Sequence, residues 1–366
     1  MNGNHPDSRP LRIAEVAPLW TAVPPGNYGG AELVVHWLTE GLVKRGHSVT
    51  LFASGDSQTQ ATLRPACEQN LLDTMAGGRA YVYDPYANSN LVEALRMAAS
   101  FDIIHCHLGS AYIPFAMVAQ TPVLQTVHAS LEFPDELWVL ERYPDVPIAA
   151  LSYAQIAAVP TERRSNIRVI YHGCDFESYE PSFTARDYLA FLGRMGPQKN
   201  PLGAIEVAKA AGLPIVLAGK PMTAAEEAYF AKSIEPLIDG HRVTYLGSVT
   251  HAQKVDLLKG AAALLFPIQW NEHFGVVMIE AMACGCPVVA CRQGSVSEVV
   301  DPGITGFYAD TVEEMARLVP QALTLDRRIV REHARLRFSV DRMVDNHVAL
   351  YRELVAGRAI TMTAGH

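Results

Sequence analysis

The chain has 366 residues, of which 49% are hydrophobic and 19% are charged. This length exceeds what one hydrophobic core usually organises, so we expect two domains. The composition is that of a globular protein and excludes a disordered or low-complexity protein. The 30 Lys and Arg residues against 38 Asp and Glu residues give a net charge of −8. No clustered basic stripe is present, which argues against binding to nucleic acid.

The N-terminal segment and the cysteines indicate the compartment. Residues 1–10 are polar and are predicted to form a disordered tail, with no apolar stretch of signal-peptide length behind them. Nowhere do about 18 apolar residues follow one another, so no transmembrane helix is expected. The six cysteines form no Cys-x-x-Cys pair and lie mostly in apolar runs, which predicts reduced thiols. We therefore expect a cytoplasmic protein, and peripheral contact with a membrane is left open.

In the first half, short apolar runs bounded by turn residues alternate with helical patterns. This arrangement is typical of a parallel sheet wrapped by helices. Between the first two runs, the segment from Ala31 to Arg45 repeats apolar residues on one face and ends at Gly46, which predicts a helix. The expected strands are 11–17, 48–53, 102–106, 123–126, 148–151 and 168–171.

A polar stretch from Asp175 to Asp187 separates this half from a fresh series of strands, and we place a domain boundary there. The prediction is an α/β chain with two doubly wound Rossmann-like domains that face each other across a cleft. The site is expected in this cleft, because such sheets bind ligands at the carboxyl ends of their strands. The predicted strands of the second half are 188–192, 214–218, 242–246, 263–266, 287–291 and 306–308. The predicted domains are 11–180 and 181–340, followed by 341–366 as a helix that returns to the first domain, plus a tail.

The most informative segment runs from Asn271 to Gly285. Its apolar residues recur with helical spacing, so a helix begins near Phe274 or Gly275, and the amides at its start form a natural seat for phosphate. Glu272 precedes this helix and Glu280 lies inside it, so the two carboxylates could accept hydroxyls on opposite sides of a diphosphate. The alternative is that Glu272 is an N-cap or first-turn partner of the helix dipole and that Glu280 is a solvated helix residue.

Two loops follow the first strands of the two halves. In the second half, Gly193 and Arg194 are followed by Lys199, and two cations at the end of a strand could clamp a diphosphate; a solvated loop is the alternative. In the first half, Gly29 and Gly30 open the first helix and would let a ligand approach the backbone, although a tight turn would also explain them. Because the glycines do not form Gly-x-Gly-x-x-Gly, dinucleotide binding is disfavoured.

Three histidines lie at the ends of first-half strands. His128 follows the strand at 123–126, and a lone histidine in such a place is more often a hydrogen-bonded structural residue. His105 and His107 form a pair, for which acceptor contact is an open alternative. Two histidines without further ligands do not predict a metal site.

Residues 271–285 are similar to the Glu-x-x-x-x-x-x-x-Glu motif of the retaining family-4 glycosyltransferases, the GT-B enzymes of the glycosyl transferases group 1. The likeness includes Phe-Gly after the first Glu and Glu-Ala-Met-Ala-x-Gly around the second. The Gly-Arg-x-x-x-x-Lys loop also resembles the family, with Asn200 where Gly is usual. Thr-x-His-Ala at His128 and Gly-Gly-x-Glu at Gly29 extend the similarity, which covers residues 11 to about 355.

The resemblance implies roles for individual residues. Glu272 would contact the transferred sugar, Glu280 the nucleotide ribose, and Arg194 and Lys199 the leaving diphosphate, while His128 would support catalysis near the anomeric centre. The further residues expected to bind the donor are Gly29, Gly30, Gly193, Gly219, Val249, His273, Phe274, Gly275 and Val276.

The implied reaction is the transfer of a hexose from a nucleotide diphosphate sugar to an acceptor hydroxyl with retention of configuration. UDP is favoured and GDP is next, and the acceptor would be a carbohydrate, a lipid-linked molecule or a small molecule. No two Asp residues are separated by a single residue, so no Asp-x-Asp metal motif exists, and we expect neither a metal nor a cofactor. Alternatives are a sugar-nucleotide epimerase of the same fold and a non-catalytic nucleotide-sugar-binding module. A nicotinamide oxidoreductase is disfavoured by the missing glycine fingerprint.

Overall fold

The computed structural model describes residues 9–26, 29–184 and 187–363, and side chains as far as residue 357. Most of the expected N-terminal tail, residues 1–8, lies outside this range. The chain divides into two compact units, unit 1 (Met1–Gly173 with Val340–His366) and unit 2 (Cys174–Ser339). The domain boundaries placed at residues 180 and 340 from sequence stay predictions.

Unit 1 is built on a seven-stranded parallel sheet in the order β3-β2-β1-β4-β5-β6-β7. Its strands are β1 (Arg12–Val16), β2 (Ser48–Ser54), β3 (Thr62–Cys67), β4 (Ile103–Cys106), β5 (Val123–Thr126), β6 (Ile148–Ala150) and β7 (Ile167–Val169). Its α-helices are α1 (Gly30–Lys44), α2 (Leu71–Ala76), α3 (Asp84–Arg96), α4 (Pro134–Arg142) and α12 (Val340–Thr363), with shorter 3₁₀ turns at Ala98–Ser100, Ser110–Val118 and Thr161–Arg163.

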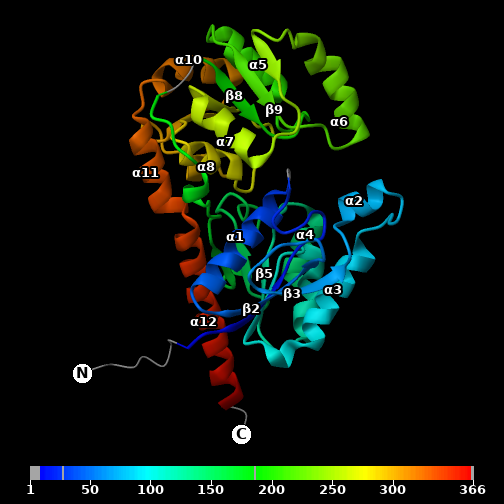
Figure 1. Ribbon diagram of the computed structural model, residues 1–366. Helices are drawn as coiled ribbons and strands as arrows, with labels where there is room; N and C mark the ends of the chain where they lie inside the picture. Colours follow the sequence, from blue (N-terminus) through cyan, green and yellow to red (C-terminus); the bar gives the residue numbers. More distant parts are fainter. Residues whose placement is uncertain (1–8, 27–28, 185–186, 364–366) are drawn as a thin grey trace, which may run out of the picture. The chain divides into compact units, whose positions relative to one another are not determined.

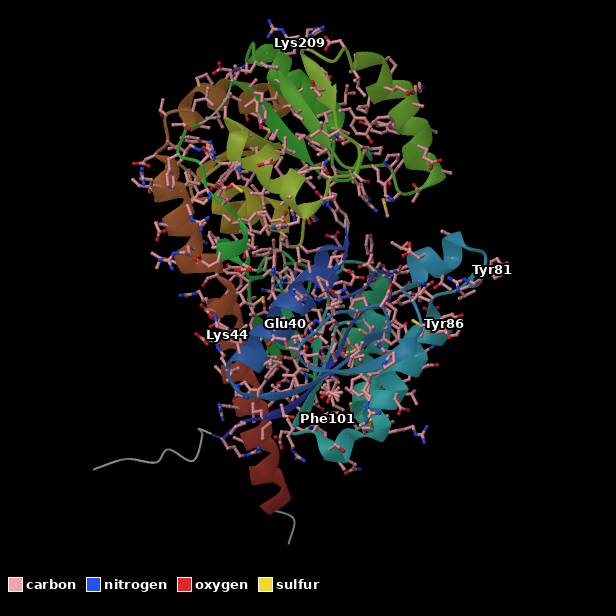
Figure 2. All side chains as sticks on the ribbon, in the orientation of Figure 1. Glu40, Lys44, Tyr81, Tyr86, Phe101 and Lys209 are labelled. Atoms are coloured by element: carbon pink, nitrogen blue, oxygen red, sulfur yellow. The ribbon has the colours of Figure 1, made fainter. Side chains whose placement is uncertain are left out.

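The helices of unit 1 pack on a sheet whose central strands β4, β5 and β6 are fully buried. Phe52 of β2 meets Phe101 edge to face, with ring centroids 6.0 Å apart, in the core that α3 covers. The helices α1 and α12 are far apart in the sequence but lie side by side in the structure (Figure 1). A Cβ at Gly41 of α1 would come within 2.6 Å of Val344 of α12, so the glycine permits this close approach. Figure 2 shows Glu40 and Lys44 projecting from α1, where Lys44 is exposed.

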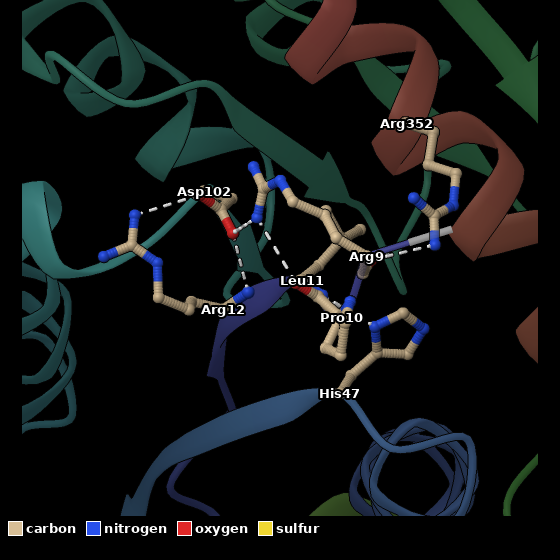
Figure 3. A network of polar contacts seen from close by, with 7 residues as sticks. All are labelled: Arg9, Pro10, Leu11, Arg12, His47, Asp102 and Arg352. Atoms are coloured by element: carbon tan, nitrogen blue, oxygen red, sulfur yellow. Dashed lines mark hydrogen bonds and ion pairs between the residues drawn. The ribbon is translucent and has the colours of Figure 1, made fainter. Parts of the chain in front are cut away.

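A polar network holds the start of β1 (Figure 3). Asp102 accepts hydrogen bonds from the Arg9 and Arg12 guanidinium groups, at 2.8 and 3.0 Å, and from the Arg12 amide. The amide of Leu11 donates to Nδ1 of His47 at 3.0 Å, and Arg352 of α12 donates to the carbonyl of Arg9 at 3.1 Å. The first strand is therefore fixed to neighbouring elements of its own unit.

Unit 2 repeats the same plan with a six-stranded parallel sheet in the order β10-β9-β8-β11-β12-β13. Its strands are β8 (Leu189–Leu192), β9 (Ile215–Ala218), β10 (Val243–Tyr245), β11 (Ala263–Phe266), β12 (Val288–Cys291) and β13 (Gly306–Ala309). Its α-helices are α5 (Pro201–Ala210), α6 (Ala224–Tyr229), α7 (His251–Gly260), α8 (Val276–Ala283), α9 (Val296–Val299), α10 (Val312–Ala322) and α11 (Arg327–Phe338). A 3₁₀ turn at Phe176–Ser178, a π-helical turn at Phe230–Ile234 and a 3₁₀ turn at Glu235–Leu237 complete it.

The strand orders confirm the doubly wound fold class expected from sequence. In each sheet the chain winds outward in one direction from the first strand and then in the other, which creates a topological switch point between β1 and β4 in unit 1 and between β8 and β11 in unit 2. Ligands of such sheets bind beyond the carboxyl ends of the strands at these points.

One strand was not predicted. β3 lies at the edge of the unit 1 sheet, pairs only with β2, contains Pro65, and has no fully buried residue. An edge strand needs no apolar face on both sides and tolerates proline, so its sequence does not show the apolar run of a central strand.

Candidate functional site

The sequence-predicted residues follow the carboxyl ends of strands in the two sheets, and we describe the two units separately. In unit 2, Gly193 and Arg194 follow β8, and Glu272 and α8 follow β11. Because β8 and β11 are neighbours in the sheet, the fold brings these two segments to one edge although they lie far apart in sequence.

Two glycines set the shape of the loops that follow β8 and β9 in unit 2. Gly219 has φ +128°, and a Cβ there would lie 1.9 Å from the carbonyl oxygen of Gly193. The two loops run in contact, with the Gly193 amide donating to Ala218 O at 3.0 Å and the Gly219 amide donating to Gly247 O at 2.8 Å. Only glycine fits this approach at Gly219, so the loops after β8 and β9 hold a fixed shape.

Arg194 is held in place by groups of its own unit. Its Nε lies 3.4 Å from Oε1 of Glu226, and a terminal nitrogen donates to Gln198 Oε1 at 3.2 Å. Glu226 in turn accepts from the Met222 amide at 2.7 Å. The guanidinium is therefore oriented before any ligand arrives, and its side chain keeps 30% exposure for an anion.

Lys199 and Glu272 form an ion pair through Lys199 Nζ and Glu272 Oε2. Trp270 Nε1 donates to the same oxygen at 3.3 Å, and the ammonium lies 5.6 Å from the Trp270 ring centroid and 5.8 Å from that of Phe266. All hydrogen bonds that side chains of the described residues make to the Glu272 carboxylate therefore go to Oε2. This leaves Oε1 as the oxygen with capacity for a hydroxyl group.

The backbone around Glu272 is equally constrained. The Ser295 amide donates to Glu272 O at 2.8 Å, and a Cβ on Gly294 would come within 2.2 Å of that same carbonyl. Gly275 has φ +76° and is the N-cap of α8, and no side chain in the described part of the chain caps this helix. The start of α8 thus has backbone amides without a side-chain cap, and their role as a seat for phosphate stays a prediction.

Glu280 is a buried residue inside α8 and not a solvated one. Its Oε1 accepts from the Tyr179 hydroxyl at 2.6 Å and from Lys254 Nζ at 2.5 Å, and Lys254 lies 5.4 Å from the Tyr179 ring centroid. Burial and the Glu280 charge raise the pKa of Tyr179, so its hydroxyl stays a donor. Both contacts use one oxygen, which leaves Oε2 for a further hydroxyl, in the same way as in Glu272.

The backbone conformation of Asn200 accounts for an asparagine at a position where the family usually has glycine. It has φ 55° and ψ 55°, the left-handed conformation in which glycine and asparagine are the favoured residues. Its side chain accepts from the Gly203 amide at 3.0 Å, so it also caps α5. Asn therefore meets the backbone requirement that Gly usually meets and adds a helix cap.

Among the other predicted donor residues of unit 2, Val249, His273 and Phe274 are buried and Val276 is half-buried. Phe274 packs edge to face against Phe338 with centroids 5.8 Å apart, and His273 contacts Trp270 at 5.0 Å. Val249 precedes α7, and Val276 is the first residue of α8. Their expected contacts with the nucleotide stay predictions.

In unit 1, the glycine loop is shaped by Gly29. Its φ is +146°, and a Cβ would meet Oγ1 of Thr21 at 2.6 Å and Cβ of Pro25 at 2.8 Å, whereas Gly30 has open space. The Thr21 amide donates to the buried carboxyl of Glu32 at 3.3 Å, and burial raises the pKa of that carboxyl. Gly29 is needed for the turn, and Gly30 leaves room beside the start of α1.

His128 belongs to a larger group that the sequence did not predict. We name as the histidine cluster the buried or half-buried polar side chains of β1, β4, α12 and the loops after β4, β5 and β7 that contact one another. Its members are Glu15, His105, His107, His128, His172, His347 and Tyr351.

Burial lowers the pKa of each histidine in the cluster. The pKa falls to about 4 for His107 and His347 and to about 3 for His172. For His128, burial and the neighbouring rings of His172 and His107 lower the pKa well below its ordinary value. Near neutral pH these rings are therefore neutral hydrogen-bonding groups and supply no positive charge.

The same burial acts on Glu15 in the opposite sense. Burial raises the pKa of the Glu15 carboxyl, but its polar contacts with the His105 and His107 imidazoles outweigh burial, so the pKa is lowered. Tyr351 donates to the other carboxylate oxygen at 2.9 Å. Glu15 is thus an ionised hydrogen-bond acceptor.

Glu15, His105 and His107 place one ligand atom each within 4.8 Å of one another, which makes them candidate metal ligands. However, His107 Nε2 lies 2.8 Å from Glu15 Oε2, whereas ligands about 2.0–2.1 Å from a tetrahedral zinc lie about 3.4 Å apart. The second nitrogens of the two rings are bonded to Thr126 and His128. We assign these contacts as hydrogen bonds.

Several residues of the site could not be predicted from the sequence, because their partners are distant along the chain. Glu226 and Lys254 look like ordinary surface charges of α6 and α7, and Tyr179 lies in a polar stretch. Glu15 was the one available signal, a charged residue within an otherwise apolar strand, which is rarely buried unless it is paired.

Two Rossmann-like α/β domains, each built on a parallel sheet, are the fold of the GT-B glycosyltransferases. The chain belongs to the family-4 glycosyltransferases: residues 28–178 match the Glycosyltransferase Family 4 model and residues 178–337 match that of the Glycosyl transferases group 1. This confirms the resemblance found in the sequence, and the protein is a glycosyltransferase enzyme.

Individual relatives agree with this assignment. The D-inositol 3-phosphate glycosyltransferase of Mycolicibacterium smegmatis is 26% identical over 380 residues, covering 89% of this chain and 86% of that protein. AviGT4, a glycosyltransferase involved in avilamycin A biosynthesis, superposes with a TM-score of 0.73 at 25% identity, over 95% of this chain and 99% of that one. HepE of Anabaena in complex with UDP-glucose gives a TM-score of 0.68 at 20% identity, over 93% and 98%.

Among the helices in the described part of the chain, none is both long and apolar enough to span a membrane.

Proposed function

We propose that this glycosyltransferase transfers a hexose from a nucleotide diphosphate sugar, with UDP-sugars favoured over GDP-sugars, to an acceptor hydroxyl without a metal ion and with retention of configuration. The observation that carries the proposal is that unit 2 holds Arg194 and Lys199 in ion pairs after β8, while the uncapped α8 follows the neighbouring strand β11. Retention rests on the family resemblance. Two relatives solved with UDP support the choice of base.

The electrostatics of the site fit departure of a diphosphate. Breaking the bond to the sugar leaves negative charge on the diphosphate, and fixed donors that face developing charge stabilise such a transition state. Arg194 is oriented by Glu226, and Lys199 by Glu272, so both cations are held before the charge develops. In this proposal they and the amides of α8 replace the metal ion that Asp-x-Asp enzymes use.

The two carboxylates are assigned to hydroxyl groups of the donor. Glu272 would accept from the sugar through Oε1 and Glu280 from the ribose through Oε2, because the other oxygen of each is already bonded. Gly29, Gly30 and His128 of unit 1 keep the roles that the family resemblance gives them, beside the phosphates and the anomeric centre.

Product analysis tests the reaction. The enzyme is incubated in EDTA with UDP-glucose or GDP-mannose and a panel of hydroxyl acceptors, chosen to include inositol phosphates and sugar phosphates because relatives carry such names. The proposal predicts a glycoside whose anomeric configuration, read by proton NMR, equals that of the donor. Inverted product, a requirement for divalent metal, or epimerised donor formed without any acceptor would contradict it.

A further inference from the structure

Within the histidine cluster, three side chains form a continuous hydrogen-bonded chain that ends at His128. Glu15 Oε2 lies 2.8 Å from His107 Nε2, and His107 Nδ1 lies 3.0 Å from His128 Nε2. Glu15 and His107 are buried, whereas His128 is half-buried. This series of hydrogen bonds therefore connects the fully buried carboxylate of Glu15 to the half-buried ring of His128.

The positions of the protons follow from the chemistry of the three groups. An ionised carboxylate can only accept, so His107 Nε2 carries the proton that it donates to Glu15. A neutral imidazole has one N–H group, so His107 Nδ1 is a bare acceptor, and His128 Nε2 must donate to it. His128 is then left with a bare Nδ1.

The surrounding contacts are consistent with this proton arrangement. Tyr351 donates its hydroxyl hydrogen to Glu15 Oε1 at 2.9 Å, so His105 Nδ1, which lies 2.6 Å from the Tyr351 oxygen, donates to Tyr351. His105 Nε2 is then the acceptor for the Thr126 hydroxyl at 2.7 Å. Each hydrogen bond of the group has one donor and one acceptor, and no proton is counted twice.

Backbone pairing between β1 and β4 fixes the positions of Glu15 and His107 relative to each other. Glu15 of β1 pairs with His105 of β4, and the amide of His107 donates to Val16 O at 3.0 Å. The start of β1 is anchored by Asp102, and Arg352 of α12 donates to the carbonyl of Arg9 (Figure 3). The carboxylate thus sits on a central strand, and the imidazole belongs to the residue directly after β4, whose amide is bonded to β1, so both groups are held as the orienting of another side chain requires.

We propose that Glu15 and His107 are positioning residues that hold His128 in the tautomer with the proton on Nε2, so that Nδ1 faces the substrate as a hydrogen-bond acceptor. The proposal rests on the proposed function for its catalytic consequence, while the tautomer itself is a property of the ligand-free protein. His128 would accept a hydrogen bond from a substrate hydroxyl and would repel a bare phosphate oxygen at that nitrogen.

Nitrogen NMR of the ligand-free protein tests the tautomer directly. The full chain is labelled with ¹⁵N-histidine, and the His128 resonances are assigned by their loss in His128→Gln. At pH 7 the wild type should show a pyrrole-type Nε2 and a pyridine-type Nδ1 for His128. The reverse assignment, or a doubly protonated ring, would overturn the proposal whether or not the enzyme transfers sugar.

Variants of His107 test the connection. His107→Leu should give His128 a mixture of tautomers and lower kcat by at least ~10-fold, as loss of an outer orienting partner does, with little change in the KM for the donor. His107→Asn returns an amide oxygen near the former Nδ1 and should recover part of kcat. If His107→Leu changes neither the His128 resonances nor kcat, the proposal is wrong.

His347→Gln is the matched control. His347 is a buried imidazole of the same cluster that bonds to the Met343 carbonyl at 2.9 Å and stands outside the chain to His128. Its replacement should leave the His128 tautomer unchanged. Stoichiometric zinc in the purified wild type would contradict the proposal, because Glu15 and His107 would then be metal ligands and not hydrogen-bonding partners. The predicted tautomer together with no transfer to any acceptor would contradict the proposed function alone.

Discussion

The two switch points use the same topology for opposite electrostatics. At β8 and β11 of unit 2, the cations of Arg194 and Lys199 are paired with carboxylates and remain partly exposed. At β1 and β4 of unit 1, one buried carboxylate, Glu15, is surrounded by neutral donors. Under the proposed function, the same fold supplies charge for an anionic leaving group in unit 2 and fixed proton positions in unit 1.

The first prediction concerns acid, which should act on unit 1. His107, His172 and His347 have pKa values of about 4, 3 and 4 in the folded protein against about 6.5 in an unfolded chain. Below pH 6.5 the unfolded state binds protons that the folded state does not. Stability is therefore complete above this pH and is lost as pH falls toward 4, by up to about 1.4 kcal/mol per pH unit for each histidine.

Urea unfolding between pH 7.5 and 5 measures this loss, in a window above the range where carboxylates titrate. His347→Gln should reduce the slope by the contribution of one histidine. A free energy of unfolding that stays constant across the window would mean that these rings are not buried in neutral form.

The next largest effect should come from the cations of unit 2. Arg194→Ala and Lys199→Ala should each lower kcat by about 10²–10³-fold, the loss typical for removal of one donor to a developing negative charge. Steady-state kinetics with a saturating sugar nucleotide measure it. Lys209→Ala, which removes an exposed cation of α5 in the same unit (Figure 2), should match the wild type. Equal activity in all three variants would remove the electrostatic contrast between the switch points.

Glu280 should affect binding more than chemistry. Glu280→Ala removes the proposed acceptor for the ribose, a hydrogen bond to a charged group worth about 1.5–3 kcal/mol, so the nucleotide should bind about 10–100-fold more weakly. Calorimetric titration with the free nucleoside diphosphate measures the change. Circular dichroism of the variant checks that burial of Lys254 without its partner has not unfolded α7 and α8.

The smallest predicted effect is on the loop that carries Lys199. Asn200→Ala loses the cap of α5 and places a Cβ residue without side-chain compensation in the left-handed region, and should cost about 1–2 kcal/mol of unfolding free energy. Asn200→Gly should cost only a few tenths. Urea unfolding of both variants decides this, and equal losses would contradict the conformational explanation.

Much of the fold could be predicted because it depends on local patterns. The central strands are short apolar runs, and β5 and β11 have the predicted bounds. The family could also be predicted from the motif around Glu272, and the role of Glu272 stays a prediction. The partners that hold them could not, since Tyr179 and Lys254 reach Glu280 only through tertiary folding.

The histidine cluster shows the same limit. His128 carries a motif, but Tyr351 approaches Glu15 from a helix at the far end of the chain. Sequence spacing contains no information on a contact of this kind. A charged residue inside a buried strand indicates only that some partner must exist.

Calorimetric titration of the wild-type protein in EDTA with UDP-, GDP- and ADP-sugars tests the central claim most directly, because it asks whether unit 2 supplies the charge that a diphosphate needs. The account predicts that at least one nucleotide sugar binds without metal and that Arg194→Ala and Lys199→Ala weaken the binding of that ligand. Binding that appears only after addition of a divalent cation, or an affinity that neither substitution changes, would contradict it.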